Sequence, residues 1–293
     1  MKTARRLSAA FVLAAVSGVA AVVPNAFVPD AMVPAVGAQA APSAERATAP
    51  SIGSAPMDHA LFDSLLARHV VSGLVDYDAF ARAPAFRAYL RQVAEARPDA
   101  WPEDDRIAYW LNVYNAYTIQ LIVSHGERTS IRNINRTLGV LRLKGPWSEP
   151  LVQAAGRRYT LDEVAHRILR RQFSEPRVHA AMTDAALGSP PLRSEAYTGS
   201  ALEGQLVDQM RRFLGEKGKN RIRAGAAWLS PVFTAYRRDF GNSTAEFGEF
   251  LAPYFAGKDR ELLQGGQFRV TPTRFDWALN AQRPGNVSGQ AGH

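Results

Sequence analysis

The stretch RIAYWLNVYNAYTIQLIV, residues 106–123, decides the fold. Its apolar residues recur at the spacing i, i+3, i+4 and i+7, which is typical of one face of an α-helix. Further apolar residues, such as Ala108, Val113 and Ile119, occupy the other sides of the same helix. Because a helix that is apolar nearly all round is buried within a domain, we expect a central helix over residues 103–124, with the other elements packed around it.

The segments on either side of this helix predict a mixed architecture. Thr160 and Glu163 form the pattern of a capping box, in which each side chain satisfies a free backbone N–H at the start of a helix. Together the patterns favour an α+β fold, a single helix-rich domain with a small antiparallel sheet, over residues 57–282. We expect helices at residues 59–70, 86–96, 161–170, 202–214, 231–240 and 244–255, hairpins at 151–160 and 220–230, strands at 177–182 and 267–272, and a further helix that begins at Ser189.

The N-terminus has the pattern of a secretory signal peptide. Lys2, Arg5 and Arg6 precede an apolar run at residues 7–23, and the small-residue site Ala38-Gln39-Ala40 follows. We therefore expect a periplasmic or secreted protein, although the apolar run is also long enough for an uncleaved membrane anchor. The expected organisation is a signal peptide at residues 1–40, a flexible linker at 41–56, the folded domain at 57–282 and a disordered tail at 283–293.

Composition excludes several kinds of chemistry. The chain contains no cysteine, so disulfides, thiolate metal sites and thiol nucleophiles are excluded. The histidines show neither the H-x-H nor the H-E-x-x-H spacing of dedicated metal sites, and we expect no metal and no cofactor. The tripeptide Asp239-Phe240-Gly241 lacks the other kinase motifs and is interpreted as the end of a helix. The net charge of +8 is compatible with an anionic envelope partner and favours a soluble protein with a charged surface, whereas an exported chain is not expected to meet nucleic acid.

Two asparagines interrupt the central helix. Asn112 and Asn115 lie three residues apart and therefore share one face of the helix. An unsatisfied buried amide costs about 1–3 kcal/mol, so both side chains must find hydrogen-bond partners. They could form the polar wall of a binding pocket, together with Tyr109 and with His166 of the helix at 161–170. They could equally tie neighbouring loop backbones to the helix.

The stretch RVHAAMTDAALGSPPL, residues 177–192, contains the residue types of a catalytic triad. Ser189 would be the nucleophile and His179 the base, with Asp184 or Asn112 as the group that orients the base. A serine followed by proline is also the pattern of a helix N-cap with proline at the first helical position. A hydroxyl used as a cap is poorly placed for activation, so the two interpretations of Ser189 compete.

Several motifs, in collinear order over nearly all of the chain after residue 40, resemble the bacterial and plant family called domain of unknown function 547. The most specific motif is the Trp-Leu-Asn-x-Tyr-Asn pattern of the central helix, at residues 110–115. The resemblance implies an exported or membrane-associated α+β domain. The other motifs are VDYDAF (75–80), SIRNI (130–134), PW (146–147), LDEVAHRILR (161–170), RVHAAMTDAALGSPPL (177–192), EAY (195–197) and FDWALN (275–280).

The chain departs from the family pattern where a site would lie. In the family, the positions of Asp184 and Ser189 tend to hold cysteines near a histidine that corresponds to His179, which implies either a thiol nucleophile or a disulfide that staples the loop. Ala165 stands where the family tends to have a glutamate beside His166. Since no thiol is present, our leading hypothesis is a non-catalytic or weakly active member that binds a small ligand or peptide in a polar cleft. The alternatives are a serine-type hydrolase of amide or ester bonds that uses Ser189 and His179, and an envelope interaction protein that contacts anionic lipid.

Overall fold

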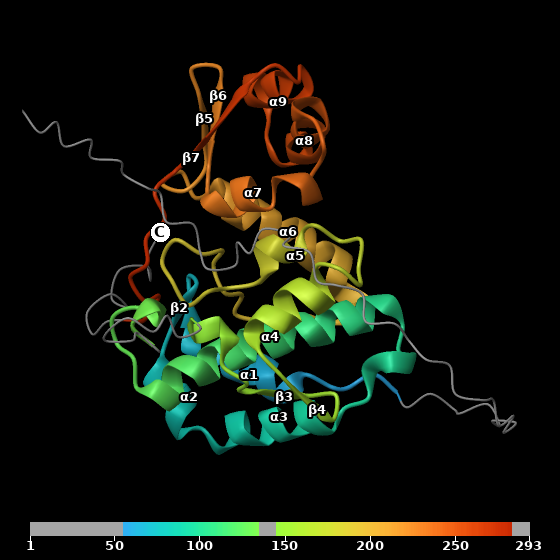
Figure 1. Ribbon diagram of the computed structural model, residues 1–293, viewed down its shortest axis with the longest axis vertical. Helices are drawn as coiled ribbons and strands as arrows, with labels where there is room; N and C mark the ends of the chain where they lie inside the picture. Colours follow the sequence, from blue (N-terminus) through green and yellow to red (C-terminus); the bar gives the residue numbers. More distant parts are fainter. Residues whose placement is uncertain (1–54, 135–144, 283–293) are drawn as a thin grey trace, which may run out of the picture.

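The structure is a computed structural model that describes residues 55–134 and 145–282. The central helix α4 (Glu103–His125) lies in its middle (Figure 1). Its first turn carries three acidic residues, which the N-terminal end of a helix dipole favours. The helix ends at Gly126, which adopts the left-handed conformation of a C-terminal cap. Nearly every residue from Ile107 to Ile122 is buried, so the prediction of a central buried helix is confirmed.

The segment before α4 contributes three helices and a short antiparallel hairpin to the same core. Phe62, Phe80 and Tyr89 are almost completely buried there, each from a different helix. The predicted helices at 59–70 and 86–96 are confirmed, with boundaries shifted by one or two residues. The elements are α1 (Ala60–His69), β1 (Val70–Val71), β2 (Leu74–Val75), α2 (Tyr77–Arg82), α3 (Pro84–Glu95) and η1 (Pro98–Ala100).

Both longer hairpins are confirmed, and one of them belongs to a sheet with an unexpected pairing. Each hairpin turns on an Ala-Gly pair in which both residues have positive φ, as a two-residue turn requires. The second hairpin is extended by β7, which pairs parallel with β6, so this sheet is mixed instead of purely antiparallel. The strands are β3 (Val152–Ala154), β4 (Arg157–Tyr159), β5 (Arg221–Arg223), β6 (Ala226–Leu229) and β7 (Arg269–Pro272).

The predicted capping box is present. The Thr160 N–H donates to Glu163 Oε2 and the Glu163 N–H donates to Thr160 Oγ1, each over 3.0 Å. The helix behind the box, η4 (Glu163–Leu169), is a π-helix instead of an α-helix. Such wide turns are rare and occur frequently at functional sites, and this one begins directly after Asp162.

The segment predicted as a strand at residues 177–182 is instead the short helix α5 (Val178–Ala181), so that prediction is wrong. The turn that leads into the helix starts at Pro176, whose carbonyl accepts a hydrogen bond from the His179 N–H over 3.2 Å. All four residues are buried, and α5 packs against α6 (Leu202–Gly215). Four residues are too few to display a helical period, so packing and not pattern decides their conformation.

No helix begins at Ser189, and the interpretation of this residue as a helix cap is therefore also wrong. Proline disfavours the helical conformation in the residue before it, and consecutive Pro190 and Pro191 impose that restriction twice. The chain runs without regular structure until η5 (Gly199–Ala201). Side chains satisfy its backbone along the way, as where Gln209 Nε2 donates to the Pro191 carbonyl over 2.8 Å.

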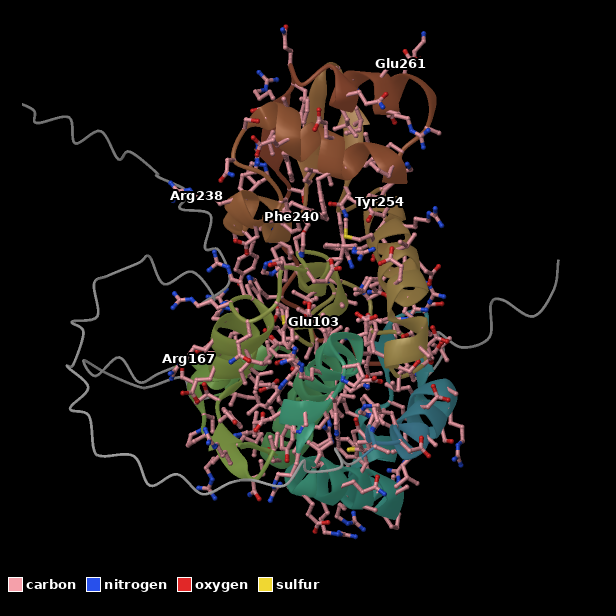
Figure 2. The ribbon with its side chains drawn as sticks, turned by 90° about the vertical axis from the view of Figure 1, so that its right-hand side faces the viewer. Glu103, Arg167, Arg238, Phe240, Tyr254 and Glu261 are labelled. Atoms are coloured by element: carbon pink, nitrogen blue, oxygen red, sulfur yellow. The ribbon has the colours of Figure 1, made fainter. Side chains whose placement is uncertain are left out.

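The C-terminal segment builds a second core that is rich in aromatic residues. Phe233, Phe240 and Phe247 are buried in it, and Figure 2 shows Phe240 between the helices while Glu261 projects from the surface. The predicted helices at 231–240 and 244–255 are each an α-helix followed by a 3₁₀ turn, and α9 was not predicted. The elements are α7 (Pro231–Ala235), η6 (Arg237–Asp239), α8 (Thr244–Leu251), η7 (Ala252–Tyr254) and α9 (Gly257–Gln264).

After the second core, the chain returns to the first. Leu279 pairs with Ala186 and Ala281 pairs with Val75 through isolated β-bridges. The predicted signal peptide, most of the linker and the tail lie outside the described residues, so these expectations stay predictions. Within the part of the chain that the structure describes, no helix combines the length and the apolar character needed to cross a membrane.

Candidate ligand-binding pocket

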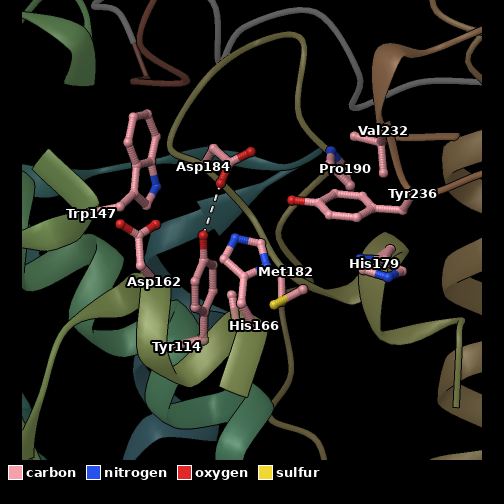
Figure 3. Close-up of a pocket in the computed structure, with 11 residues that line it drawn as sticks. Tyr114, Trp147, Asp162, His166, His179, Met182, Asp184, Pro190, Val232 and Tyr236 are labelled. Atoms are coloured by element: carbon pink, nitrogen blue, oxygen red, sulfur yellow. Dashed lines mark hydrogen bonds between the residues drawn. The ribbon is translucent and has the colours of Figure 1, made fainter. Parts of the chain in front are cut away.

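A small pocket lies where α4, η3 (Pro146–Ser148), η4 and the loop after α5 meet the beginning of the second core (Figure 3). Its cavity measures about 30 Å³, above the roughly 10–15 Å³ that a cavity needs to hold one water molecule. Asp162, His166 and Asp184 keep partial exposure, so the pocket reaches the solvent. The polar and aromatic residues of its lining are Tyr114, Trp147, Asp162, His166, His179, Asp184 and Tyr236.

Two carboxyl groups share this pocket without a cation. The Tyr114 hydroxyl donates to Asp184 Oδ1 over 2.8 Å, and the Ser148 hydroxyl donates to Asp162 Oδ2 over 2.7 Å. Burial is the main cause that raises the pKa of Asp184 to about 6; the charge of Asp162 adds to it, and the hydrogen bond from Tyr114 opposes it. Burial likewise raises the pKa of Asp162. No ion pair among the described residues includes either carboxylate, and both are therefore stabilised by neutral donors alone.

The indole of Trp147 adds a donor that no acceptor satisfies. The side chain is only 6% exposed, and its Nε1–H has no hydrogen-bond partner among the described residues. The N–H lies near enough to Asp184 to lower the pKa of that carboxyl, yet not in a geometry that makes a hydrogen bond. Figure 3 shows the indole nitrogen on the side of the ring that faces the two carboxyl groups. A buried donor without a partner costs free energy, about 1–3 kcal/mol.

His179 is held by a residue that the sequence did not indicate. Its Nε2 lies 2.7 Å from Asp239 Oδ2, and its ring stacks on Tyr236 with centroids 4.1 Å apart. Arg170 binds the same carboxylate through Nε and Nη2, at 2.6 and 3.0 Å. Burial lowers the pKa of His179, so we assign it as a neutral imidazole that donates from Nε2. Although burial opposes it, hydrogen bonds from His179 and Arg170 lower the pKa of Asp239, which is ionised.

The second imidazole of the pocket is also neutral at physiological pH. Burial, followed by the charge of Arg170, lowers the pKa of His166 to about 4. His166 lies beside Tyr236, with ring centroids 5.9 Å apart. Neither histidine therefore brings a positive charge into the pocket, and the charge of Arg170 is compensated by Asp239.

The predicted triad does not assemble. The Ser189 hydroxyl is buried and accepts a hydrogen bond from the Asp184 N–H over 3.1 Å. The hydrogen bonds of the described residues do not join Ser189 to an imidazole, since His179 uses Nε2 for Asp239. His179 and Asp184 both line the pocket, whereas Ser189 supports the loop that carries Asp184. A serine without an aligned base is a weak nucleophile.

Of the four predicted binding residues, His166 lines the pocket, whereas the other three bind backbone groups outside it. Asn112 bridges the N–H and C=O of Tyr197, over 2.9 and 2.8 Å. Asn115 accepts from the Thr183 N–H and donates to the Ala181 carbonyl, each over 3.0 Å. The Tyr109 hydroxyl bridges the Val93 carbonyl and the Ala155 N–H, over 2.8 and 2.9 Å. Asn112 and Asn115 thus tie loop backbones to α4, and Asn115 positions the chain just before Asp184.

Among the described residues, no group of three or more histidine, aspartate and glutamate side chains is arranged to hold a metal ion. The acidic pair is therefore not accompanied by a third ligand of that kind. Asp162 and Asp184 contribute two carboxylates, whereas His166 lies beside Tyr236 and does not complete a metal site with them. What the arrangement offers is a negative, aromatic-walled pocket for a small polar group.

Fold and pocket together define a helix-rich α+β protein with an acidic, aromatic-walled pocket beside its central helix. A family model described as "Protein of unknown function, DUF547" matches residues 98–214. This match confirms the resemblance for residues 98–214, whereas the motifs at 75–80 and 275–280 lie outside the matched segment. No curated protein and no solved structure is significantly similar to the chain. Three residues of the site, Val232, Tyr236 and Asp239, lie beyond the matched segment.

Proposed function

We propose that this protein is a non-catalytic or weakly active binding protein that holds a small ligand, or the end of a peptide, in the pocket between Trp147, Asp184 and Tyr236. The observation that carries the proposal is the set of unmatched polar groups in one cavity. Two carboxylates lack a cation and the Trp147 N–H lacks an acceptor, within the part of the chain that the structure describes. A ligand that supplies these partners would remove the cost of leaving them unpaired.

The geometry gives less support to a serine-type hydrolase. Ser189 is buried and serves the Asp184 backbone, and His179 is committed to Asp239. Hydrolysis would require Ser189 to leave its partner and His179 to turn toward it. A fluorophosphonate reagent tests this alternative directly, because it labels a serine that an adjacent base activates. We expect no labelling that depends on Ser189.

We further propose that the protein acts outside the cytoplasm. The proposal rests on the basic start, the apolar run at 7–23 and the site at Ala38-Gln39-Ala40. Determination of the N-terminal residue of the protein recovered from cell fractions tests it. A mature chain that begins after Ala40 in the periplasmic or secreted fraction supports export, and a full-length chain in the soluble cytoplasmic fraction contradicts it.

Binding in the pocket is tested by thermal unfolding with three small probes of different charge: glycinamide, acetate and acetamide. A ligand that binds the folded state alone raises the melting temperature in a saturable way. Ala165→Leu, which adds bulk to the lining from η4, should abolish the shift. Asp99→Asn, which changes an exposed carboxyl outside the lining, should leave it intact. A saturable shift that Ala165→Leu does not reduce, or the absence of a shift with every probe, would contradict the proposal.

A further inference from the structure

We infer that the ligand presents a primary ammonium group with a hydrogen-bond acceptor beside it, as in an amino amide or the amino end of a peptide. The inference rests on the proposed binding function and names the chemistry that the pocket recognises. It is carried by the placement of Asp162, Asp184 and Trp147 around one cavity. The three side chains reach this cavity from different segments, before η4, after α5 and within η3.

The two carboxylates call for a positive partner. Each already accepts one hydrogen bond from a neutral hydroxyl, Tyr114 or Ser148, which leaves further lone pairs on each carboxylate free. An ammonium group has three donors and no acceptor, so it can satisfy both carboxylates at once. Hydrogen bonds between ionised partners are about twice as strong as those between neutral groups. An anionic ligand would instead face two like charges in a partly desolvated space.

The unpartnered Trp147 N–H calls for an acceptor on the same ligand. This donor is buried and faces the carboxyl groups, so a bare ammonium ion would leave it unsatisfied. A carbonyl oxygen next to the carbon that bears the amine can accept from the indole while the ammonium contacts Asp184. The adjacent acceptor therefore distinguishes an amino amide or peptide end from a simple alkylamine.

The surrounding residues agree with a cationic group. The neutral His166 and His179 do not oppose it, and Arg170 is paired with Asp239. The aromatic rings of Tyr236 and Trp147 form part of the wall.

The size of the cavity limits what enters. A space of about 30 Å³ accommodates only a small end group, so the ammonium and the adjacent carbonyl oxygen must enter together while the rest of the molecule extends toward solvent. The partial exposure of Asp162, His166 and Asp184 identifies the side on which it leaves. The pocket thus selects for the end of a molecule and not for its full length. A free amino amide and a peptide amino terminus present the same end.

The experiment compares matched probes by isothermal titration calorimetry with the full chain. Glycinamide carries both features, glycolamide replaces its ammonium with a hydroxyl, and ethylammonium lacks the carbonyl. We expect glycinamide to bind at least about tenfold more tightly than glycolamide, which loses the charged interaction, and than ethylammonium, which leaves the indole N–H unsatisfied; each loss is worth about 1.4 kcal/mol or more. Triglycine, compared with its N-acetylated form, extends the test to peptides. Comparable binding of glycinamide and triglycine indicates recognition of peptide amino ends, and binding of glycinamide alone indicates a free amino amide.

Variants then assign the two contacts. Asp184→Asn should weaken the binding of glycinamide by about tenfold and leave the affinity for glycolamide unchanged, because only glycinamide carries a charge. Trp147→Phe should weaken glycinamide but not ethylammonium, which has no acceptor for the indole. Asp99→Asn is the matched exposed carboxyl and should alter neither.

The outcomes separate the two proposals. If acetate, acetamide or glycolamide binds in the pocket at least as tightly as glycinamide, the ammonium inference is wrong while the binding function stands. If no probe binds, both proposals fail. If glycinamide binds but Asp184→Asn has no effect on its affinity, the protein binds this class of ligand at another place, and the assignment to this pocket is refuted.

Discussion

Replacement of Asp184 by asparagine should make the protein more stable above neutral pH. Asparagine has nearly the same shape, and its carbonyl oxygen can still accept the hydrogen bond from Tyr114. What it removes is a negative charge that burial and the neighbouring Asp162 disfavour, the same causes that raise the pKa of Asp184 to about 6. The perturbation therefore isolates the cost of keeping this carboxylate in the pocket.

The magnitude follows from linkage between protonation and folding. Because the folded state raises the pKa above the usual aspartate value of about 4, the folded protein holds the proton more tightly than the unfolded chain does. The stability that the proton confers is complete below pH ~4 and is lost as the pH rises through ~6. A difference of this size corresponds to about 3 kcal/mol. The partial exposure of Asp184 reduces it by solvent screening, and we expect a gain of about 1–2 kcal/mol for Asp184→Asn at pH 8.

Urea unfolding at a series of pH values measures this effect. The stability difference between Asp184→Asn and the parent should be near zero or negative at pH 4.5 and should rise to its full value by pH 7.5. Asp99→Asn, at an exposed position, should show no such rise. A variant less stable than the parent at pH 8, or a difference that is flat with pH, would refute the reasoning. A stabilised variant that no longer binds glycinamide would identify Asp184 as a residue kept for function at the expense of stability.

Three further substitutions test hydrogen bonds that hold the pocket and the loops around α4, each by urea unfolding. Asp239→Asn should destabilise by about 1–3 kcal/mol, because it weakens the partly buried bond to His179 and the more exposed ion pair with Arg170; an unchanged midpoint would show that these bonds add nothing net. Asn112→Ala should lower the free energy of unfolding by about 2–4 kcal/mol, because the buried N–H and C=O of Tyr197 each lose their partner. A loss below about 1 kcal/mol would mean that these groups find other partners. Ser189→Ala should cost only about 1 kcal/mol, since one hydrogen bond is lost. Fluorophosphonate labelling present in the parent and absent from Ser189→Ala would restore the hydrolase hypothesis.

Local patterns predicted the elements that local physics determines. The apolar periodicity of residues 106–123 is long enough to identify α4, and the Thr160–Glu163 capping box is satisfied within four residues. The Ala-Gly turns are likewise determined locally, since both residues of each turn have positive φ. Where packing decides, the same reasoning failed. Residues 177–182 are too short to show a period, and each residue of β6 pairs with a β7 residue 43 positions later in the chain.

The site was predicted in part for the same reason. His166, His179 and Asp184 were identified by residue type, and all three line the pocket. Asp239 was interpreted as a helix end, because nothing in the sequence pairs it with a histidine 60 residues earlier. Trp147 was singled out only as part of a family motif. Whether a tryptophan N–H finds an acceptor depends on tertiary contacts that no local pattern encodes.

The two positions at which the chain departs from the family pattern act together in the structure. The resemblance to the family implies cysteines at the positions of Asp184 and Ser189. In this chain the Ser189 hydroxyl accepts a hydrogen bond from the Asp184 backbone N–H. Ser189 therefore fixes the loop that presents a carboxylate where the family would present a thiol. A thiol could have served as a nucleophile, whereas a carboxylate beside Asp162 is unfavourable unless a proton or a cation accompanies it. Loss of the reactive group and gain of the negative charge both argue for a site that binds a cationic ligand instead of cleaving one.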